Sequence, residues 1–130
     1  MIVIDASLAL DLVLVTRDAK EIMARLNATD RAMAAPEVFD LEILQTIRRL
    51  RLSGSIDETR VDAAMGVFLS VPVERYSHAP LRRRIWDLRQ NLTAYDAAYF
   101  ALAEMLDAPL WTRDRKFAAV PGHVARVEIL

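Results

Sequence analysis

Three aspartates lie where strands or helices are expected to begin or end, and carboxylates in such places can do chemistry. Asp5 follows the apolar run MIVI, Asp114 lies two residues beyond the run APLWT, and Asp96 opens the apolar stretch DAAYFALAEM. In a parallel sheet, the strand ends that bind ligands meet at one rim. Carboxylates that converge there without a cationic partner repel one another, which raises a pKa or requires a bound cation. A hard divalent ion such as Mg²⁺ prefers such oxygen ligands.

A fourth acid lies on the segment PEVFDLEILQTIRRL, residues 36–50. At 100° per residue, the apolar arc of this segment is formed by four side chains: Phe39, Ile43, Ile47 and Leu50. Glu42 lies on the flank of the arc, whereas Asp40 lies closer to its centre, so the pattern alone does not choose between them. A purely structural explanation of Glu42 would pair it with Thr46 or Arg49.

Each of these acids also has an ordinary explanation when it is taken alone. An acid in the first turn of a helix, such as Asp96, stabilises the helix dipole by about 0.3–1 kcal/mol. Asp5 is equally suited to a plain helix cap. Together, however, the acids suit metal-assisted phosphodiester hydrolysis, in which the ion lowers the pKa of a bound water and neutralises phosphate charge. The hydroxyls of Ser7 and Thr112, at the same strand ends, are suited to hold waters or a phosphate.

The composition limits the other kinds of site. A chain of 130 residues with 54% hydrophobic and 27% charged residues predicts one globular domain, residues 1–130. The absence of cysteine excludes disulfides and thiolate metal sites, and two distant histidines disfavour a histidine-built zinc site. The start MIVID does not resemble a signal peptide, and no apolar run reaches the roughly 18 residues of a membrane span. We therefore expect a cytoplasmic protein that is not bound to a membrane.

Two features leave nucleic-acid binding open. The net charge of −1 gives no general argument for a polyanionic partner. Basic residues nevertheless cluster at 48–51, 82–84 and 113–116, either as solvated helix faces or as contacts to phosphate. Four aromatic side chains are candidates for stacking on bases: Trp86, Tyr95, Tyr99 and Trp111. Of these, Trp86 and Tyr99 are expected to be core residues instead.

Strands and helices are expected to alternate along the chain. Apolar runs predict strands at 1–4, 31–36, 71–76, 108–112 and 124–129. Helical spacing and caps predict helices at 6–15, 18–28, 36–52, 56–69, 79–90, 94–107 and 115–119. The expected helix starts are Ser7 as a cap, Pro36 as a first residue, the SIDE capping box at 55–58, and Thr93 as a cap. The alternation predicts an α/β fold with a mostly parallel sheet of about five strands flanked by helices.

Four blocks together resemble a known family. They are VIDAS at 3–7, P-x5-E at 36–42 with RR at 48–49, LTAYDAAYFALAE at 92–104, and LWTRDRKFA at 110–118. This pattern is similar to the PIN-domain ribonucleases and, among them, to the VapC toxins of bacterial toxin–antitoxin pairs. The resemblance implies that Asp5, Glu42, Asp96 and Asp114 bind Mg²⁺ or Mn²⁺, and it favours Glu42 over Asp40. It assigns supporting roles to Ser7 and Thr112.

The same resemblance implies an activity and partners. Family members cut single-stranded or looped RNA by water attack, and such a toxin would inhibit translation and growth. A homodimer is implied, together with a VapB-type antitoxin whose tail blocks the acidic site. Two alternatives remain from the residues themselves. One is a receiver-like phosphoacceptor domain, which also places carboxylates at strand ends, and the other is a non-catalytic PIN-like binding partner.

Overall fold

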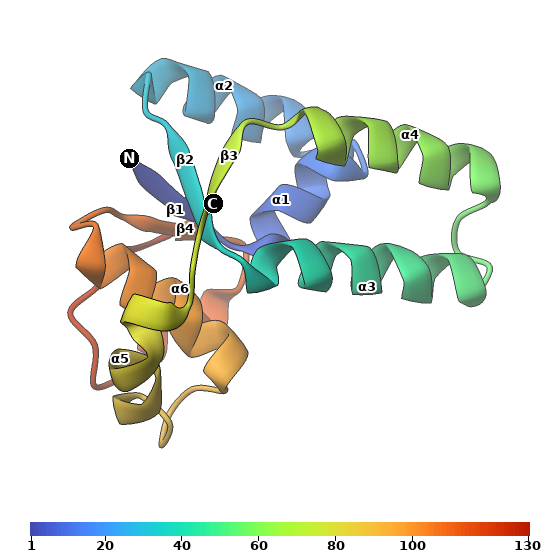
Figure 1. Ribbon diagram of the computed structural model, residues 1–130. Helices are drawn as coiled ribbons and strands as arrows, with labels where there is room; N and C mark the ends of the chain where they lie inside the picture. Colours follow the sequence, from blue (N-terminus) through green and yellow to red (C-terminus); the bar gives the residue numbers. More distant parts are fainter.

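A five-stranded parallel sheet lies at the centre of the protein. The computed structural model describes residues 1–130, and its strand order is β3-β2-β1-β4-β5 (Figure 1). The strands are β1 (Ile2–Ile4), β2 (Met33–Pro36), β3 (Val73–Tyr76), β4 (Leu110–Thr112) and β5 (Val127–Ile129). The central strand β1 pairs through Val3 with Ala34 on one side and with Leu110 on the other. The prediction of an α/β fold with five mostly parallel strands is therefore confirmed.

Two groups of helices flank the sheet. The α-helices are α1 (Ala6–Val13), α2 (Ala19–Thr29), α3 (Val38–Leu52), α4 (Glu58–Ser70), α5 (Arg82–Asp87) and α6 (Ala94–Met105). Two short 3₁₀ segments, η1 (Ala79–Leu81) and η2 (Arg115–Ala119), complete the set. Helix α1 packs against α2, α3 and α4 (Figure 1). Helix α6 packs against β1, β2 and β4, and α5 packs against α6. None of these helices combines the length and the apolar character needed to cross a bilayer.

Helix α6 contains the longest buried run of any helix in the chain. All seven residues from Ala97 to Ala103 are buried. A helical run that is apolar on every side belongs inside a protein, and the four alanines of this run allow close approach to the strands. Only its first turn reaches the rim of the sheet, and that turn carries Asp96. The packing of α6 therefore fixes the position of this carboxylate.

Two of the predicted helix caps are wrong, for the same physical reason. Asp5, not Ser7, caps α1 by accepting a hydrogen bond of 3.0 Å from the Leu8 backbone N–H. Asp57, not the predicted Ser55–Glu58 box, caps α4. In both places an aspartate competes with a nearby serine for the capping position. A carboxylate accepts from the exposed N–H groups more strongly because it also interacts with the helix dipole.

Three predicted boundaries are also shifted. Pro36 is the last residue of β2 and pairs with Tyr76, so it is not the first residue of α3. The helix predicted at 79–90 is a 3₁₀ turn followed by α5, which ends at Asp87. Helix α6 was predicted to end at residue 107 but ends at Met105, and Asp107 adopts a left-handed backbone conformation with φ of 46°. Helix α3, in contrast, ends at Leu52 as predicted, before Gly54 at φ of 77°.

Candidate active site

The structure brings four carboxylates to the carboxyl ends of the strands. Asp5 directly follows β1, Asp114 lies two residues beyond β4, Asp96 lies in the first turn of α6, and Glu42 lies on α3. Burial raises the pKa of Asp5 and Asp96, and the nearby charge of Asp114 raises both further. The charges of Asp96 and Asp5 help to raise the pKa of Glu42. The four side chains therefore form one electrostatic cluster, although they come from four separate parts of the chain.

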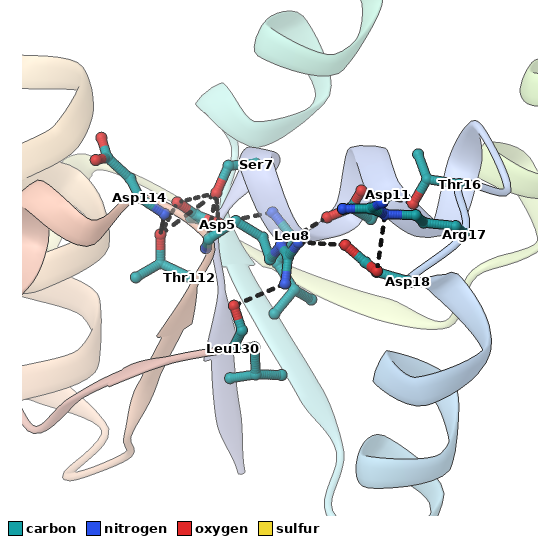
Figure 2. Close-up of polar contacts among 11 residues, drawn as sticks. Asp5, Ser7, Leu8, Asp11, Thr16, Arg17, Asp18, Thr112, Asp114 and Leu130 are labelled. Carbon is teal, nitrogen blue, oxygen red and sulfur yellow. Dashed lines mark hydrogen bonds and ion pairs between the residues drawn. The ribbon is translucent and has the colours of Figure 1, made fainter.

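Asp5 is the buried member of this cluster, with 4% of its surface exposed. Its carboxylate accepts hydrogen bonds from the Leu8 backbone N–H at 3.0 Å, from Ser7 Oγ at 2.7 Å and from Thr112 Oγ1 at 2.5 Å (Figure 2). Burial raises the pKa of Asp5, and these three hydrogen bonds lower it without fully offsetting the burial. Ser7 Oγ lies 2.7 Å from Oδ1 and 2.9 Å from Oδ2, so each carboxylate oxygen has two neighbouring donors: Leu8 and Ser7 at Oδ1, and Thr112 and Ser7 at Oδ2.

The two supporting hydroxyls join Asp5 to the turn that follows β4. Ser7 Oγ accepts from the Arg113 backbone N–H at 3.1 Å, and Thr112 Oγ1 accepts from the Asp114 backbone N–H at 2.9 Å. Because each hydroxyl is already an acceptor there, its own hydrogen is free to point to the Asp5 carboxylate. Ser7 and Thr112 thus hold Asp5 and the backbone of Asp114 in a fixed relation (Figure 2).

The side chain of Arg113 anchors the same turn from the other side. Its guanidinium pairs with Asp11 at 2.9 Å and with Asp18 at 2.5 Å, and it donates to the Leu130 carbonyl at 2.7 Å. Figure 2 shows Asp11, Asp18 and Leu130, the three partners of this guanidinium. The charges of Asp11 and Asp18 are therefore compensated by Arg113. These two acids do not belong to the uncompensated cluster.

Glu42 is held by a residue that the sequence analysis did not assign to the site. Tyr99 Oη donates to Glu42 Oε1 at 3.1 Å, and the Tyr99 ring is buried in the core, as predicted. Burial, with the neighbouring Glu42 charge, raises the pKa of the Tyr99 hydroxyl, so it stays a donor. The purely structural explanation, in which the Glu42 carboxylate pairs with Thr46 or Arg49, is wrong. Thr46 donates to the Glu42 backbone carbonyl instead, and Arg49 donates to Thr46. The one available signal was a phenol, that of Tyr99, within the otherwise apolar buried run from Ala97 to Ala103.

None of the four clustered carboxylates has a basic partner within 4 Å. Other acids near the sheet are paired, and Asp40 is one of them, at 2.8 Å from Arg75. This pairing gives Asp40 a structural role and separates it from Glu42. Uncompensated carboxylates in a half-buried cluster favour a bound cation.

The donor set fits a hard divalent ion. It consists of carboxylate and hydroxyl oxygens only, which Mg²⁺ and Mn²⁺ accept. No three of the acids lie close enough together to hold one ion directly. An ion here would therefore contact one or two carboxylates and reach the others through water, an arrangement that is common for Mg²⁺.

The substitution Glu42→Gln tests whether the cluster is under electrostatic strain. Glutamine keeps the acceptor for Tyr99 and removes one charge. Burial and the charges of Asp96 and Asp5 raise the pKa of Glu42 in the folded protein, so its ionisation destabilises the fold as the pH rises from the ordinary glutamate value of 4.5 through the raised value. Without divalent ions, the variant should therefore melt up to about 4 °C above the unaltered protein at pH 7–8. At pH 4 the two proteins should melt at the same temperature. Thermal denaturation at the two pH values measures this, and a lower melting temperature at pH 8 would contradict the assignment.

The aromatic side chains divide differently from the prediction. Trp86 was expected in the core, but 61% of its surface is exposed, and Arg89 lies over its ring at 4.6 Å. Trp111 is buried beside β1, so it is not available for stacking on a base. Tyr95, in contrast, is 65% exposed next to Asp96.

Comparison with known proteins places this arrangement in a family. The family model described as "PIN domain" matches residues 2–123, which is most of the chain. The chain belongs to the PIN-domain family. It is 37% identical over 130 residues to Ribonuclease VapC12 of Mycobacterium tuberculosis, covering 100% of this chain and 99% of that protein. It is also 36% identical to Ribonuclease VapC1 of the same organism, covering 98% and 96% of the two chains.

Solved structures of VapC and VapBC proteins share the fold. The VapBC2 structure from Rickettsia felis, bound to a DNA fragment from its promoter, matches with a TM-score of 0.72 at 15% identity, over 100% and 99% of the two chains. VapC20 of M. tuberculosis, described as a sarcin-ricin loop cleaving toxin, matches with a TM-score of 0.69 at 20% identity, over 95% and 97%. Membership of the PIN-domain family removes the receiver-like alternative.

Proposed function

We propose that this PIN domain is an endoribonuclease toxin that depends on Mg²⁺ or Mn²⁺ and cuts single-stranded or looped RNA. The observation that carries the proposal is the cluster of Asp5, Glu42, Asp96 and Asp114 without basic partners. Relatives named ribonucleases, 36–37% identical over nearly the full chain, support the activity.

Each part of the site has a role in this reaction. A bound Mg²⁺ or Mn²⁺ would supply an activated water and neutralise charge on the phosphate. Asp5, oriented by Ser7 and Thr112, and Asp114 on the anchored turn would bind on one side of the site. Asp96 and Glu42 would complete the negative field that orients the attacking water in line with the leaving 3′ oxygen. Hydrolysis of the bond between phosphorus and this 3′ oxygen leaves a 5′-phosphate and a 3′-hydroxyl.

The proposed partners are a VapB-type antitoxin and a second copy of the chain. Structures similar in fold include toxin–antitoxin complexes, such as the complex from Klebsiella pneumoniae with a TM-score of 0.67. Several large apolar side chains are exposed on the helices, among them Leu44, Leu52 and Leu69. Exposed apolar surface of this kind marks protein interfaces. Release from the antitoxin would then expose the acids to cellular RNA and inhibit translation and growth.

A cleavage assay tests the activity. The purified protein should cut a mixed pool of single-stranded RNA with Mg²⁺ or Mn²⁺, and EDTA should abolish cleavage because the acids alone cannot activate water. Sequencing of the new ends should find 5′-phosphates. Cleavage that persists in EDTA would contradict the metal dependence. No cleavage by a folded protein that still binds its antitoxin would support the non-catalytic alternative.

A further inference from the structure

A cavity of about 530 Å³ opens beside the acids, between α3 and the first turn of α6. Glu42 and Asp96 form part of its wall, so it is continuous with the candidate active site. Its volume lies within the roughly 300–1,000 Å³ typical of sites for small ligands. The rest of its polar wall comes from residues to which the mechanism above gives no role: Gln45, Thr46, Arg49, Thr93 and Tyr95.

The residues of α3 that line the cavity follow one helix face. Glu42, Thr46 and Arg49 are separated by four and three residues, so their side chains lie above one another. Two turns of α-helix separate Glu42 from Arg49, which is about 10 Å along the axis. Arg49 Nη2 donates to Thr46 Oγ1, which places the guanidinium beside Thr46, one turn from Glu42. It is well placed for a phosphate further along the same strand.

Arg49 is the one basic side chain that lines this cavity, and its charge is uncompensated. It donates only to Thr46 Oγ1, at 3.3 Å, and no carboxylate lies within 4 Å of it. Its neighbours differ: Arg51 pairs with Glu58 at 2.7 Å, and Arg48 does not line the cavity. A free guanidinium beside acids that repel a polyanion supplies the attraction that an approaching phosphate needs, and its planar fork matches a phosphate.

Tyr95 supplies the other half of a nucleotide site. It forms part of the cavity wall, and its ring is 65% exposed. Its neighbours in the chain are the helix residue Ala94 and the candidate ligand Asp96, so its backbone is held in the first turn of α6. An exposed aromatic ring on a fixed backbone is a stacking platform for a base of any type.

We propose that this cavity binds a nucleotide of single-stranded RNA adjacent to the scissile phosphate, with Arg49 on a phosphate and Tyr95 stacked on the base. The inference rests on the proposed nuclease activity and adds the place where the substrate strand is held.

The test measures RNA binding by Arg49→Gln and Tyr95→Leu, with Arg48→Gln as the matched control for loss of charge on α3. A fluorescent single-stranded RNA of mixed sequence is titrated by anisotropy in Ca²⁺ buffer at several salt concentrations, and gels check that it stays intact. Arg49→Gln should weaken binding about tenfold and reduce the salt slope by about 0.7, the value for one phosphate contact. Tyr95→Leu should weaken binding about 5- to 100-fold with the slope unchanged, because stacking carries no charge. Arg48→Gln should change neither the binding affinity nor the salt slope.

Three results would overturn this inference. They are equal effects of Arg49→Gln and Arg48→Gln, no effect of Tyr95→Leu, or a change of oligomeric state in either cavity variant by light scattering. The last result would make the cavity a contact between two copies. Steady-state cleavage adds a second measure, in which KM should rise and kcat should change less than about twofold. If the unaltered protein cuts no RNA while the binding changes appear as expected, the nuclease proposal fails and the cavity assignment does not.

Discussion

Asp5→Asn is expected to reduce kcat/KM for RNA cleavage by about a thousandfold or more while the fold is retained. Asparagine is as good a helix cap as aspartate, so the hydrogen bond from the Leu8 N–H is kept. The substitution removes the buried negative charge that Ser7 and Thr112 orient. Loss of a metal-binding carboxylate costs several kcal/mol of transition-state stabilisation, and each 1.4 kcal/mol is about a factor of ten in rate.

A matched control comes from the same chain. Asp107→Asn removes one carboxylate at an exposed helix end whose left-handed conformation suits asparagine, so activity should be unchanged. Circular dichroism and thermal denaturation of both variants separate a loss of chemistry from a loss of fold. Cleavage by folded Asp5→Asn within about tenfold of the unaltered rate would remove Asp5 from the reaction. Equal losses in both variants would show that the assay responds to net charge alone.

The fold is readable from the sequence because it depends on local patterns. Short β-branched runs such as MIVI alternate with helical spacing, and that alternation requires a parallel sheet covered by helices. The convergence of Asp5 and Asp114 then follows from topology, since parallel strands end at the same rim. Asp96 follows from the cap at Thr93, which the structure confirms by the hydrogen bond from the Asp96 N–H at 3.1 Å.

The contacts that hold the carboxylates are not readable in this way, because they join distant parts of the chain. Ser7 and Thr112 are 105 residues apart, and Tyr99 is 57 residues from Glu42. Periodicity identifies which face of a helix is buried, but it does not say which side chain of another element lies opposite. The choice between Asp40 and Glu42 shows this limit, since Arg75, 35 residues from Asp40, decides it.

The arginine clusters show the same limit. In sequence, the arginines at 82–84 look alike, yet Arg84 forms a two-pronged pair with Glu104 at 2.7 and 3.0 Å. Arg82 donates only to a backbone carbonyl nearby, so it stays a surface charge. Whether an arginine is structural or available for RNA depends on where the acids lie after folding. A charge pattern alone therefore could not single out Arg49.

Thr112→Val is the second substitution with a large expected effect. Valine has nearly the same shape, so the packing at this fully buried position is kept. It cannot donate to Asp5 Oδ2, now at 2.5 Å, and it cannot accept from the Asp114 N–H, now at 2.9 Å. An unsatisfied buried group costs about 1–3 kcal/mol, so the melting temperature should fall by about 3–12 °C. Because both bonds position candidate ligands, the apparent affinity for Mg²⁺ should also fall about 10- to 100-fold.

The two effects of Thr112→Val are separable with Thr112→Ser, which keeps the hydroxyl and loses a methyl group. Serine should restore the Mg²⁺ dependence of cleavage even where the lost methyl lowers the melting temperature. A titration of cleavage rate against Mg²⁺, with all three proteins compared well below their melting temperatures, measures this. If valine shifts the melting temperature but not the Mg²⁺ midpoint, the hydroxyl stabilises the turn after β4 without positioning the acids. If serine weakens Mg²⁺ binding as much as valine does, the hydroxyl alone is not sufficient to hold Asp5 and Asp114 in register.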